Sequence, residues 1–232
     1  MKLIQISQKA IRFETDEQTK TRKGLNMNTK QRILDEALTL FSEKGYANVY
    51  VGDIAERVGI KAPSLYKHYK NKQAIFDAII EEMNERFVRQ ASILSINGKD
   101  AKADADIYKS ISEDKLIELG KSFFMYYLHD DYNKKFRKML TIEQFRDEQL
   151  ASIYTKLYVD DPLSYQGMLF GMICAAGVLK TDNVDIMTLH FYAPIYMLLT
   201  ICDRDPKREK EAIKTLEAHL IQFDKLYGRK KK

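Results

Sequence analysis

Apolar residues recur at intervals of three and four positions through most of the chain, which is the spacing of amphipathic α-helices. Ten glycines and four prolines in 232 residues leave little of the turn punctuation that strands require. The fold class is therefore predicted to be all-α. Helices are expected at 29–44, 51–58, about 61–68, 72–97, 113–129, 131–158 with a break, 162–180, 185–203 and 206–227, with the polar stretch 99–106 as a linker.

The first three predicted helices carry clear start and stop signals. Asn28 or Thr29 can cap the first helix, and Gly45 can end it. Gly59 supplies a positive φ for a tight turn between the second and third helices. Pro63 fits only the first turn of a helix, so the third helix should begin at about Lys61 or Ala62 and end near His68.

The net charge of +5 is unevenly distributed along the chain. Residues 229–232 are all basic and residues 1–26 carry six basic and three acidic residues, so residues 27–228 hold about −2. Residues 57–76 nevertheless contain no acidic residue and form a local basic patch, made of Arg57, Lys61, Lys67, Lys70 and Lys72. This patch coincides with the tight turn and the third helix.

A helix that enters the DNA major groove needs a rigid brace, a tight turn, small residues for close approach and cations for phosphates. All four features occur between Asp53 and Tyr69. The brace is expected to be Ile54, Ala55, Val58 and Leu65, and the outward side chains to be Lys61, Ala62, Ser64, Lys67 and His68. The pattern predicts a DNA-binding helix-turn-helix.

The motif Asp53-Ile54-Ala55, Gly59-Ile60, Leu65-Tyr66-Lys67-His68-Tyr69 and Lys72 resembles the signature of the TetR family of transcriptional regulators, over roughly residues 29–90. The resemblance implies an all-helical homodimer that binds a palindromic operator, and a C-terminal domain that binds a small molecule, most often to relieve repression. It places Lys61 to Ser64 and Lys67 on the recognition helix, and Tyr66, His68 and Lys72 near the phosphates. The expected DNA contacts are Tyr50, Lys61, Ala62, Pro63, Ser64, Tyr66, Lys67, His68 and Lys72.

The chain departs from the family at Tyr50 and Lys61, where Ser or Thr is common. Each departure removes a side-chain helix cap worth about 1 kcal/mol. The expected organisation is a flexible extension at 1–26, a helix-turn-helix DNA-binding domain at 27–72, a helical ligand-binding and dimerisation domain at 73–228 and a basic tail at 229–232. Met27 is an alternative natural start, and the extension could also be a basic arm that touches DNA.

The second half is expected to hold a site for a small apolar effector, which releases the protein from DNA, and a dimer interface. Pockets between helices are lined by apolar and aromatic residues with few polar groups. The candidates for ligand binding are Phe123, Phe124, Tyr127, Phe145, Gln166, Met168 and Met172, with His129 and His190 as further polar candidates. The candidates for the dimer interface are Leu189, Ala193, Tyr196, Ile213, Leu216, Leu220 and Phe223, although a partner for the last helix could also lie in the same chain. Pro194 is expected to kink its helix or restart it.

Other classes of protein have weaker support. There is no nucleophile elbow, P-loop or HExxH motif, and the four histidines lack metal-ligand spacing, so an enzyme, a metal site and a cofactor are not expected. Cys174 and Cys202 read as reduced core residues. The apolar runs are too short to span a bilayer, which predicts a cytoplasmic protein without a membrane partner. The remaining alternative is a helical ligand-binding or partner-binding module whose helix-turn-helix is only structural.

Overall fold

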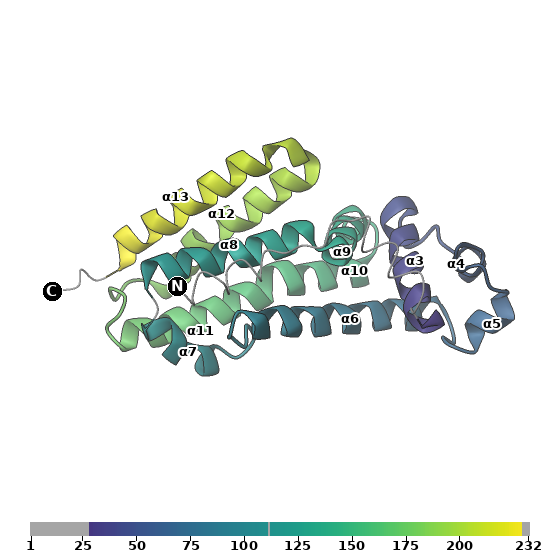
Figure 1. The fold of residues 1–232 in the computed structure, drawn as a ribbon, viewed down its shortest axis with the longest axis horizontal. Helices are drawn as coiled ribbons and strands as arrows, with labels where there is room; N and C mark the ends of the chain where they lie inside the picture. The colour runs from purple at the N-terminus through teal and green to yellow at the C-terminus, as the bar shows by residue number, and fades with distance from the viewer. Residues whose placement is uncertain (1–27, 111, 229–232) are drawn as a thin grey trace, which may run out of the picture. The chain divides into compact units, whose positions relative to one another are not determined.

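A computed structural model describes residues 28–110 and 112–228, and it divides into two compact units between Glu82 and Met83. Over these residues the chain is helical, and the sole β pairing is an isolated bridge between Leu179 and Gly228 (Figure 1). The predicted all-α class is therefore confirmed. The expected extension at 1–26 and basic tail at 229–232 lie outside the described residues.

Unit 1 contains α3 (Thr29–Lys44), α4 (Val51–Val58), α5 (Ala62–Tyr66) and the start of α6 (Lys72–Ile93). The side chain of Asn28 caps α3 by accepting a hydrogen bond from the backbone N–H of Lys30 at 3.1 Å. Gly45 follows the helix with φ +83°. The predicted bounds of the first two helices are confirmed. The fully buried core of unit 1 includes Ile33, Ala37, Leu38, Phe41, Ile54, Leu65, Ile75, Phe76 and Ile79.

The boundary between the units lies within α6, later than the predicted boundary at residue 72. Ile75 and Phe76 are fully buried, and the ring of Phe76 lies 5.1 Å from that of Tyr46. The first turns of α6 therefore complete the core of unit 1. The amphipathic pattern of α6 is continuous, so the pattern alone gave no sign of where one core ends.

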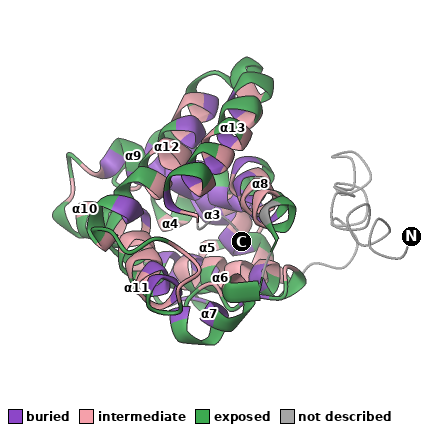
Figure 2. Cartoon of the chain, turned by 90° about the vertical axis from the view of Figure 1, so that its left-hand side faces the viewer, coloured by how far each residue is buried: buried purple, intermediate pink, exposed green. Residues whose placement is uncertain are grey.

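Unit 2 holds the rest of α6 and a helical bundle. Its elements are α7 (Ala101–Ser110), α8 (Glu113–His129), α9 (Asp131–Glu143), α10 (Glu148–Thr155), a π-helical turn η1 (Lys156–Asp160), α11 (Asp161–Ala175), α12 (Val184–Arg204), a 3₁₀ turn η2 (Pro206–Arg208) and α13 (Glu209–Tyr227). Figure 2 shows buried residues as stripes along these helices, with exposed residues on the other faces. The helix α12 continues through Pro194, so the expected restart does not occur there.

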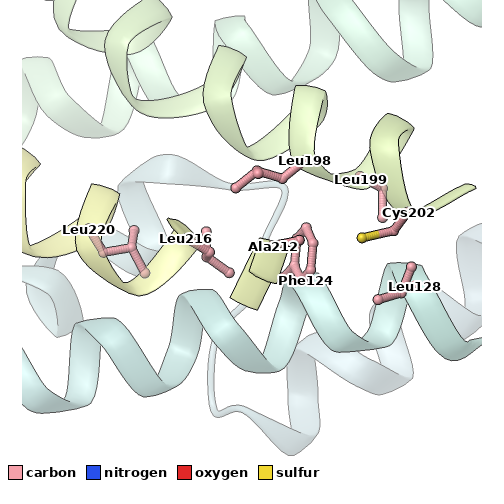
Figure 3. Packing of buried hydrophobic residues seen from close by; sticks show 8 residues of the cluster. All are labelled: Phe124, Leu128, Leu198, Leu199, Cys202, Ala212, Leu216 and Leu220. Carbon is pink, nitrogen blue, oxygen red and sulfur yellow. The ribbon is translucent and has the colours of Figure 1, made fainter. Parts of the chain in front are cut away.

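The main cluster of buried side chains in unit 2 joins α8, α12 and α13 (Figure 3). Leu216 and Leu220 of α13 pack against Phe124 of α8 and Leu198 of α12. A Cβ atom built on Gly120 would lie 2.8 Å from Leu220 Cδ1, so glycine permits this close approach of α8 and α13. The apolar seam of the last helix is thus covered within the same chain.

The predicted linker at 99–106 is wrong, because most of it belongs to helix α7. The Asp100 carboxylate accepts hydrogen bonds from the backbone N–H groups of Lys102 and Ala103, at 2.9 and 3.2 Å, and so marks the helix start. Ala101 and Ala105 are buried in a cluster with Leu169 and Ile173 of α11. Although the Lys and Asp residues of this stretch are typical of a loop, the small side chains of Ala101 and Ala105 allow α7 and α11 to pack closely.

Two features of the described residues bear on membrane insertion and metal binding. Among them, α12 is long and apolar enough to cross a membrane by length and composition, a property that core helices of helical bundles share. Within the same residues, no group of three or more His, Cys, Asp or Glu side chains is placed to hold a metal ion. Both cysteines are buried.

Candidate nucleic-acid interface

The tight turn between α4 and α5 is made by Gly59, whose φ and ψ of 76° and 34° are left-handed. Its backbone N–H donates to Glu56 O at 3.0 Å, and that of Ile60 donates to Ala55 O at 2.9 Å. These bonds satisfy carbonyl groups at the end of α4, and the left-handed conformation costs glycine no Cβ clash. The turn therefore sets the direction in which α5 leaves α4.

The helix α5 begins at Ala62, with Pro63 in its first turn as predicted. It ends at Tyr66, two residues before the predicted end, and a hydrogen-bonded turn continues to Tyr69. The N–H groups of His68 and Tyr69 both donate to Leu65 O, at 2.8 and 3.1 Å. Since Leu65 is fully buried, its side chain anchors α5 to the core of unit 1.

The expected loss of two helix caps is visible in the structure. Neither Tyr50 nor Lys61 makes a capping bond with its side chain at the N-cap position. Instead, the Asp53 carboxylate accepts a hydrogen bond from the backbone N–H of Tyr50 at 2.7 Å. The carboxylate also lies in the first turn of α4, where the helix dipole favours a negative charge. Asp53 thus stabilises the start of α4 without the cap.

Most predicted DNA contacts lie on the exposed side of the α4–α5 pair. Tyr50 is 72 % exposed and Tyr66 is 53 % exposed. Ala62, Ser64 and Lys72 are half-buried, and the other exposed members of the set are Lys61, Pro63, Lys67 and His68. The sequence-based separation of a buried brace from an outward face is reproduced. The buried brace consists of Ile54, Ala55, Val58 and Leu65.

Lys72 differs from the other cations of the patch because its ammonium contacts main-chain carbonyls. Its Nζ donates to Tyr46 O at 2.8 Å and to Ala47 O at 3.5 Å, and lies 4.4 Å from the centroid of the Tyr46 ring. The Tyr46 hydroxyl in turn donates to Gln73 Oε1 at 3.0 Å. These contacts fasten the segment after α3 to the start of α6. Lys72 therefore positions the helix-turn-helix in addition to its expected place near phosphates.

Three other cations of unit 1, of which Arg57 alone was placed in the basic patch, make contacts that were not predicted from the sequence. Arg57 pairs with Glu36 at 3.0 Å, so its charge ties α4 to α3. Arg32 Nη2 donates to Val58 O at 2.6 Å, at the end of α4. Lys30 Nζ lies 5.5 Å from the centroid of the Tyr69 ring, beside the end of α5. These partners are distant in sequence, and no local pattern pointed to them.

The seven ligand-binding candidates of unit 2 do not form one site. Phe124 belongs to the buried cluster of α8, α12 and α13, and Tyr127 packs beside it. Phe123 packs against a separate cluster with Leu119, and Met172 packs against that of α7 and α11. Phe145 is 89 % exposed and Met168 is 51 % exposed, which corrects the expectation that they line an interior pocket. Phe145 lies in the turn after α9, where no helix covers it.

Gln166 and the two histidine candidates have distinct surroundings. The Oε1 atom of Gln166 is buried without a hydrogen-bond partner. His129 Nε2 lies 2.9 Å from Glu209 Oε1, and His190 Nδ1 lies 2.6 Å from the Tyr227 hydroxyl. Both histidines therefore connect α13 to another helix of unit 2.

The dimer candidates divide into two groups. Leu189, Ala193 and Phe223 line an open apolar groove of about 390 Å³ between α12 and α13, together with His190, Pro194, His219, Gln222 and Leu226. Leu216 and Leu220 are instead buried in their own bundle, at 0 % and 2 % exposure, so their assignment to a dimer interface is corrected. Ile213 packs against the same core. The Tyr196 hydroxyl forms a hydrogen bond with the Tyr154 hydroxyl.

Unit 1 thus presents a short exposed helix behind a braced turn, with cations and no acidic side chain between residues 57 and 76. This geometry defines a helix-turn-helix DNA-binding domain. Residues 33–79 match the model described as "Bacterial regulatory proteins, tetR family". Residues 33–79 are therefore similar to the DNA-binding domain of TetR-family regulators.

Curated relatives match a short part of the chain. The biofilm operon icaADBC HTH-type negative transcriptional regulator IcaR of Staphylococcus epidermidis is 46 % identical over 59 residues, which cover 25 % of this chain and 32 % of the relative. IcaR of Staphylococcus aureus strain Newman is 46 % identical over 52 residues, 22 % of this chain and 28 % of the relative. The chain thus spans about a third of the length of these relatives or less.

Solved structures extend the likeness to most of the chain. A putative TetR-family regulator from Mesorhizobium loti has a TM-score of 0.60 at 18 % identity, and the match covers 87 % of this chain and 97 % of that one. NalD, the secondary repressor of the MexAB-OprM efflux pump of Pseudomonas aeruginosa, has a TM-score of 0.60 at 22 % identity, covering 88 % and 97 %. At such identities the likeness establishes the fold.

Proposed function

We propose that this chain is a transcriptional repressor that binds a palindromic DNA operator as a homodimer and is released by a small molecule. The observation that carries the proposal is the exposed helix α5, with Lys61 and Lys67 beside it in a stretch, residues 57–76, whose sequence holds no acidic residue. Small residues at its start, Ala62 and Ser64, allow close approach to base edges. The cytoplasm, where bacterial DNA lies, is the proposed location.

Charge reversal at Lys67 tests DNA binding directly. Lys67→Glu replaces an exposed cation of the interface by an anion, which repels phosphate. The dissociation constant for DNA from the gene's own upstream region should rise about tenfold or more, and the dependence of binding on salt should become weaker. Binding is measured by fluorescence anisotropy over a range of salt concentrations, and footprinting identifies the protected sequence.

The matched control is Lys138→Glu, which makes the same charge change at an exposed lysine of α9 in unit 2. It should leave DNA affinity unchanged. Equal affinity of wild type and Lys67→Glu would instead favour a ligand-binding or partner-binding module with a structural helix-turn-helix. A protected palindrome would support the homodimer, because a two-fold dimer places its recognition helices on half-sites ~34 Å apart.

The proposed dimer surface is the apolar groove of α12 and α13. Several apolar side chains of these two helices remain exposed, including Leu189, Met197 and Leu226. A second copy can cover this surface through an isologous two-fold interface, in which the same four residues meet their counterparts. The four central residues are Leu189, Ala193, Phe223 and Leu226.

The proposed effector is a small molecule that binds unit 2, with no cofactor or metal required for DNA binding. Regulators of the same fold include one in a SmeT–triclosan complex and one named flavonoid-responsive regulator FrrA. Residues of α6 belong to both units, so a change in unit 2 can reach the helix-turn-helix through this helix. A coupling of about 1–3 kcal/mol between effector and DNA is sufficient. Equal DNA affinity with and without the effector would contradict this regulation.

A further inference from the structure

A group of tyrosines links four segments of unit 2 that are distant in sequence. The hydroxyls of Tyr154 and Tyr196 hydrogen bond to each other, and the Tyr192 hydroxyl donates to Tyr158 O at 2.8 Å. The carbonyl of Tyr127 accepts a hydrogen bond from Arg137 Nη1 at 3.1 Å. We call these residues the tyrosine cluster: Tyr127 of α8, Tyr154 of α10, Tyr158 of η1, and Tyr192 and Tyr196 of α12.

The rings of the cluster lie at the distances of aromatic pairs. The centroids of Tyr154 and Tyr158 are 5.4 Å apart, and those of Tyr192 and Tyr196 are 6.0 Å apart with the rings nearly parallel. Tyr158 is buried, whereas the other four tyrosines are half-buried. The cluster therefore combines a buried base with aromatic side chains that solvent can reach.

The positive charge beneath the cluster is already neutralised. The Arg137 guanidinium is 2 % exposed, and its Nε and Nη2 atoms donate to the two Asp203 oxygens at 2.5 and 2.7 Å. Burial by itself would lower the pKa of Arg137, but the hydrogen bonds and charge of Asp203 outweigh burial, and the pKa is raised. A ligand at this place meets a compensated ion pair and gains little from a charge of its own.

The hydroxyls of Tyr158 and Tyr192 are uncharged at neutral pH. Burial raises the pKa of Tyr158 and of Tyr192 well above the usual value of 10.0. These groups therefore keep their protons and can donate hydrogen bonds. A neutral acceptor, such as a carbonyl or ether oxygen, is the complementary group on a ligand.

Tyr158 is the member of the cluster whose hydrogen bonding is incomplete. Its hydroxyl is buried and has no hydrogen-bond partner, a state that native proteins seldom retain without a reason. The residue also lies in the π-helical turn η1, and such turns occur often at functional sites. The hydroxyl is thus a buried donor without an acceptor, on a ring that packs against those of Tyr154 and Tyr196.

We infer that the tyrosine cluster is the effector site of the proposed repressor, and that its ligand is a neutral, planar aromatic molecule carrying a hydrogen-bond acceptor. The ligand packs on half-buried rings of the cluster and accepts a hydrogen bond from the Tyr158 hydroxyl. This inference rests on the proposed function for its regulatory meaning, but binding itself is measured without DNA.

The test uses coumarin, a neutral planar lactone with a carbonyl acceptor, and the anion coumarin-3-carboxylate. Each is titrated into the full-length protein by calorimetry, and thermal unfolding is followed in parallel. Tyr158→Phe removes the unpartnered hydroxyl and keeps the ring. It should leave the unfolding temperature unchanged or higher, yet raise the dissociation constant for coumarin about 2- to 13-fold, the equivalent of one net hydrogen bond.

The matched control is Tyr126→Phe, which removes another buried hydroxyl without a hydrogen-bond partner from α8. It should bind coumarin as wild type does. Three results would overturn the inference: no coumarin binding at millimolar concentration, equal binding by wild type and Tyr158→Phe, or tighter binding of the carboxylate than of coumarin. If the wild-type protein did not bind DNA in the absence of coumarin, the proposed repressor function would be contradicted, but the assignment of the ligand site would not.

Discussion

Single residues of the helix-turn-helix carry more than one task, and Lys72 is the clearest case. The resemblance to the TetR family places it near the phosphates. In the structure its ammonium bonds to the carbonyls of Tyr46 and Ala47, which brace the segment before α4. The same cation can stabilise the domain and face DNA, whereas Lys67 is simply exposed.

Replacing Lys72 should therefore affect folding as well as DNA binding. Lys72→Met keeps the aliphatic chain but removes the hydrogen bonds of the ammonium to the Tyr46 and Ala47 carbonyls and its contact with the Tyr46 ring. We expect a loss of about 1–2 kcal/mol in the free energy of unfolding. Urea unfolding followed by circular dichroism measures it. The exposed neighbour serves as control: Lys70→Met should change stability by less than about 0.5 kcal/mol, and a similar loss in both variants would refute the bracing role.

Among the helices, the ends that are set by nearby residues were predicted correctly, whereas a helix that is stabilised by contacts distant in sequence was missed. The bounds of α3 and α4 follow from Asn28, Gly45 and Gly59, whose effects act within a few residues. The helix α7 was mistaken for a linker because its helical face is made of small residues. The helix α7 is held in place by Asp104, which is 1 % exposed and accepts a hydrogen bond from the Tyr165 hydroxyl at 2.8 Å. Tyr165 lies 61 positions further along the chain.

Asp104 also holds the end of the connection between α6 and α7. Its oxygens accept from the backbone N–H groups of Asn97 and Gly98, both at 2.7 Å. Asp104→Ala leaves three donors without an acceptor and should lower the free energy of unfolding by about 3 kcal/mol. The exposed control Asp106→Ala should be indistinguishable from wild type in the same denaturant titration. A small effect of Asp104→Ala would mean that water replaces the carboxylate at these donors.

In the whole molecule, the spacing of apolar residues along a helix does not show whether their apolar face is covered by the same chain or by a second copy. The seam of α13 predicted a packed face, yet Leu216 and Leu220 are covered by α8 and α12 of the same chain. The groove formed by Leu189, Ala193 and Phe223 lies on another side of the α12–α13 pair. The sequence could identify the two helices but could not divide their apolar residues between core and surface.

The groove makes the proposed dimer testable with one charge. Leu189 is 45 % exposed, so Leu189→Glu should fold normally. In the two-fold interface, however, each protomer would bury one glutamate charge. We expect the dimer to weaken by about 2 kcal/mol or more, as measured by sedimentation equilibrium. Ile142→Glu alters a comparably exposed residue of α9, at 38 % exposure, and should remain dimeric. Because a palindrome is bound through two linked recognition helices, Leu189→Glu should also weaken operator binding while leaving the helix-turn-helix intact. If Leu189→Glu dimerised as tightly as wild type, the dimer interface would have to lie outside this groove.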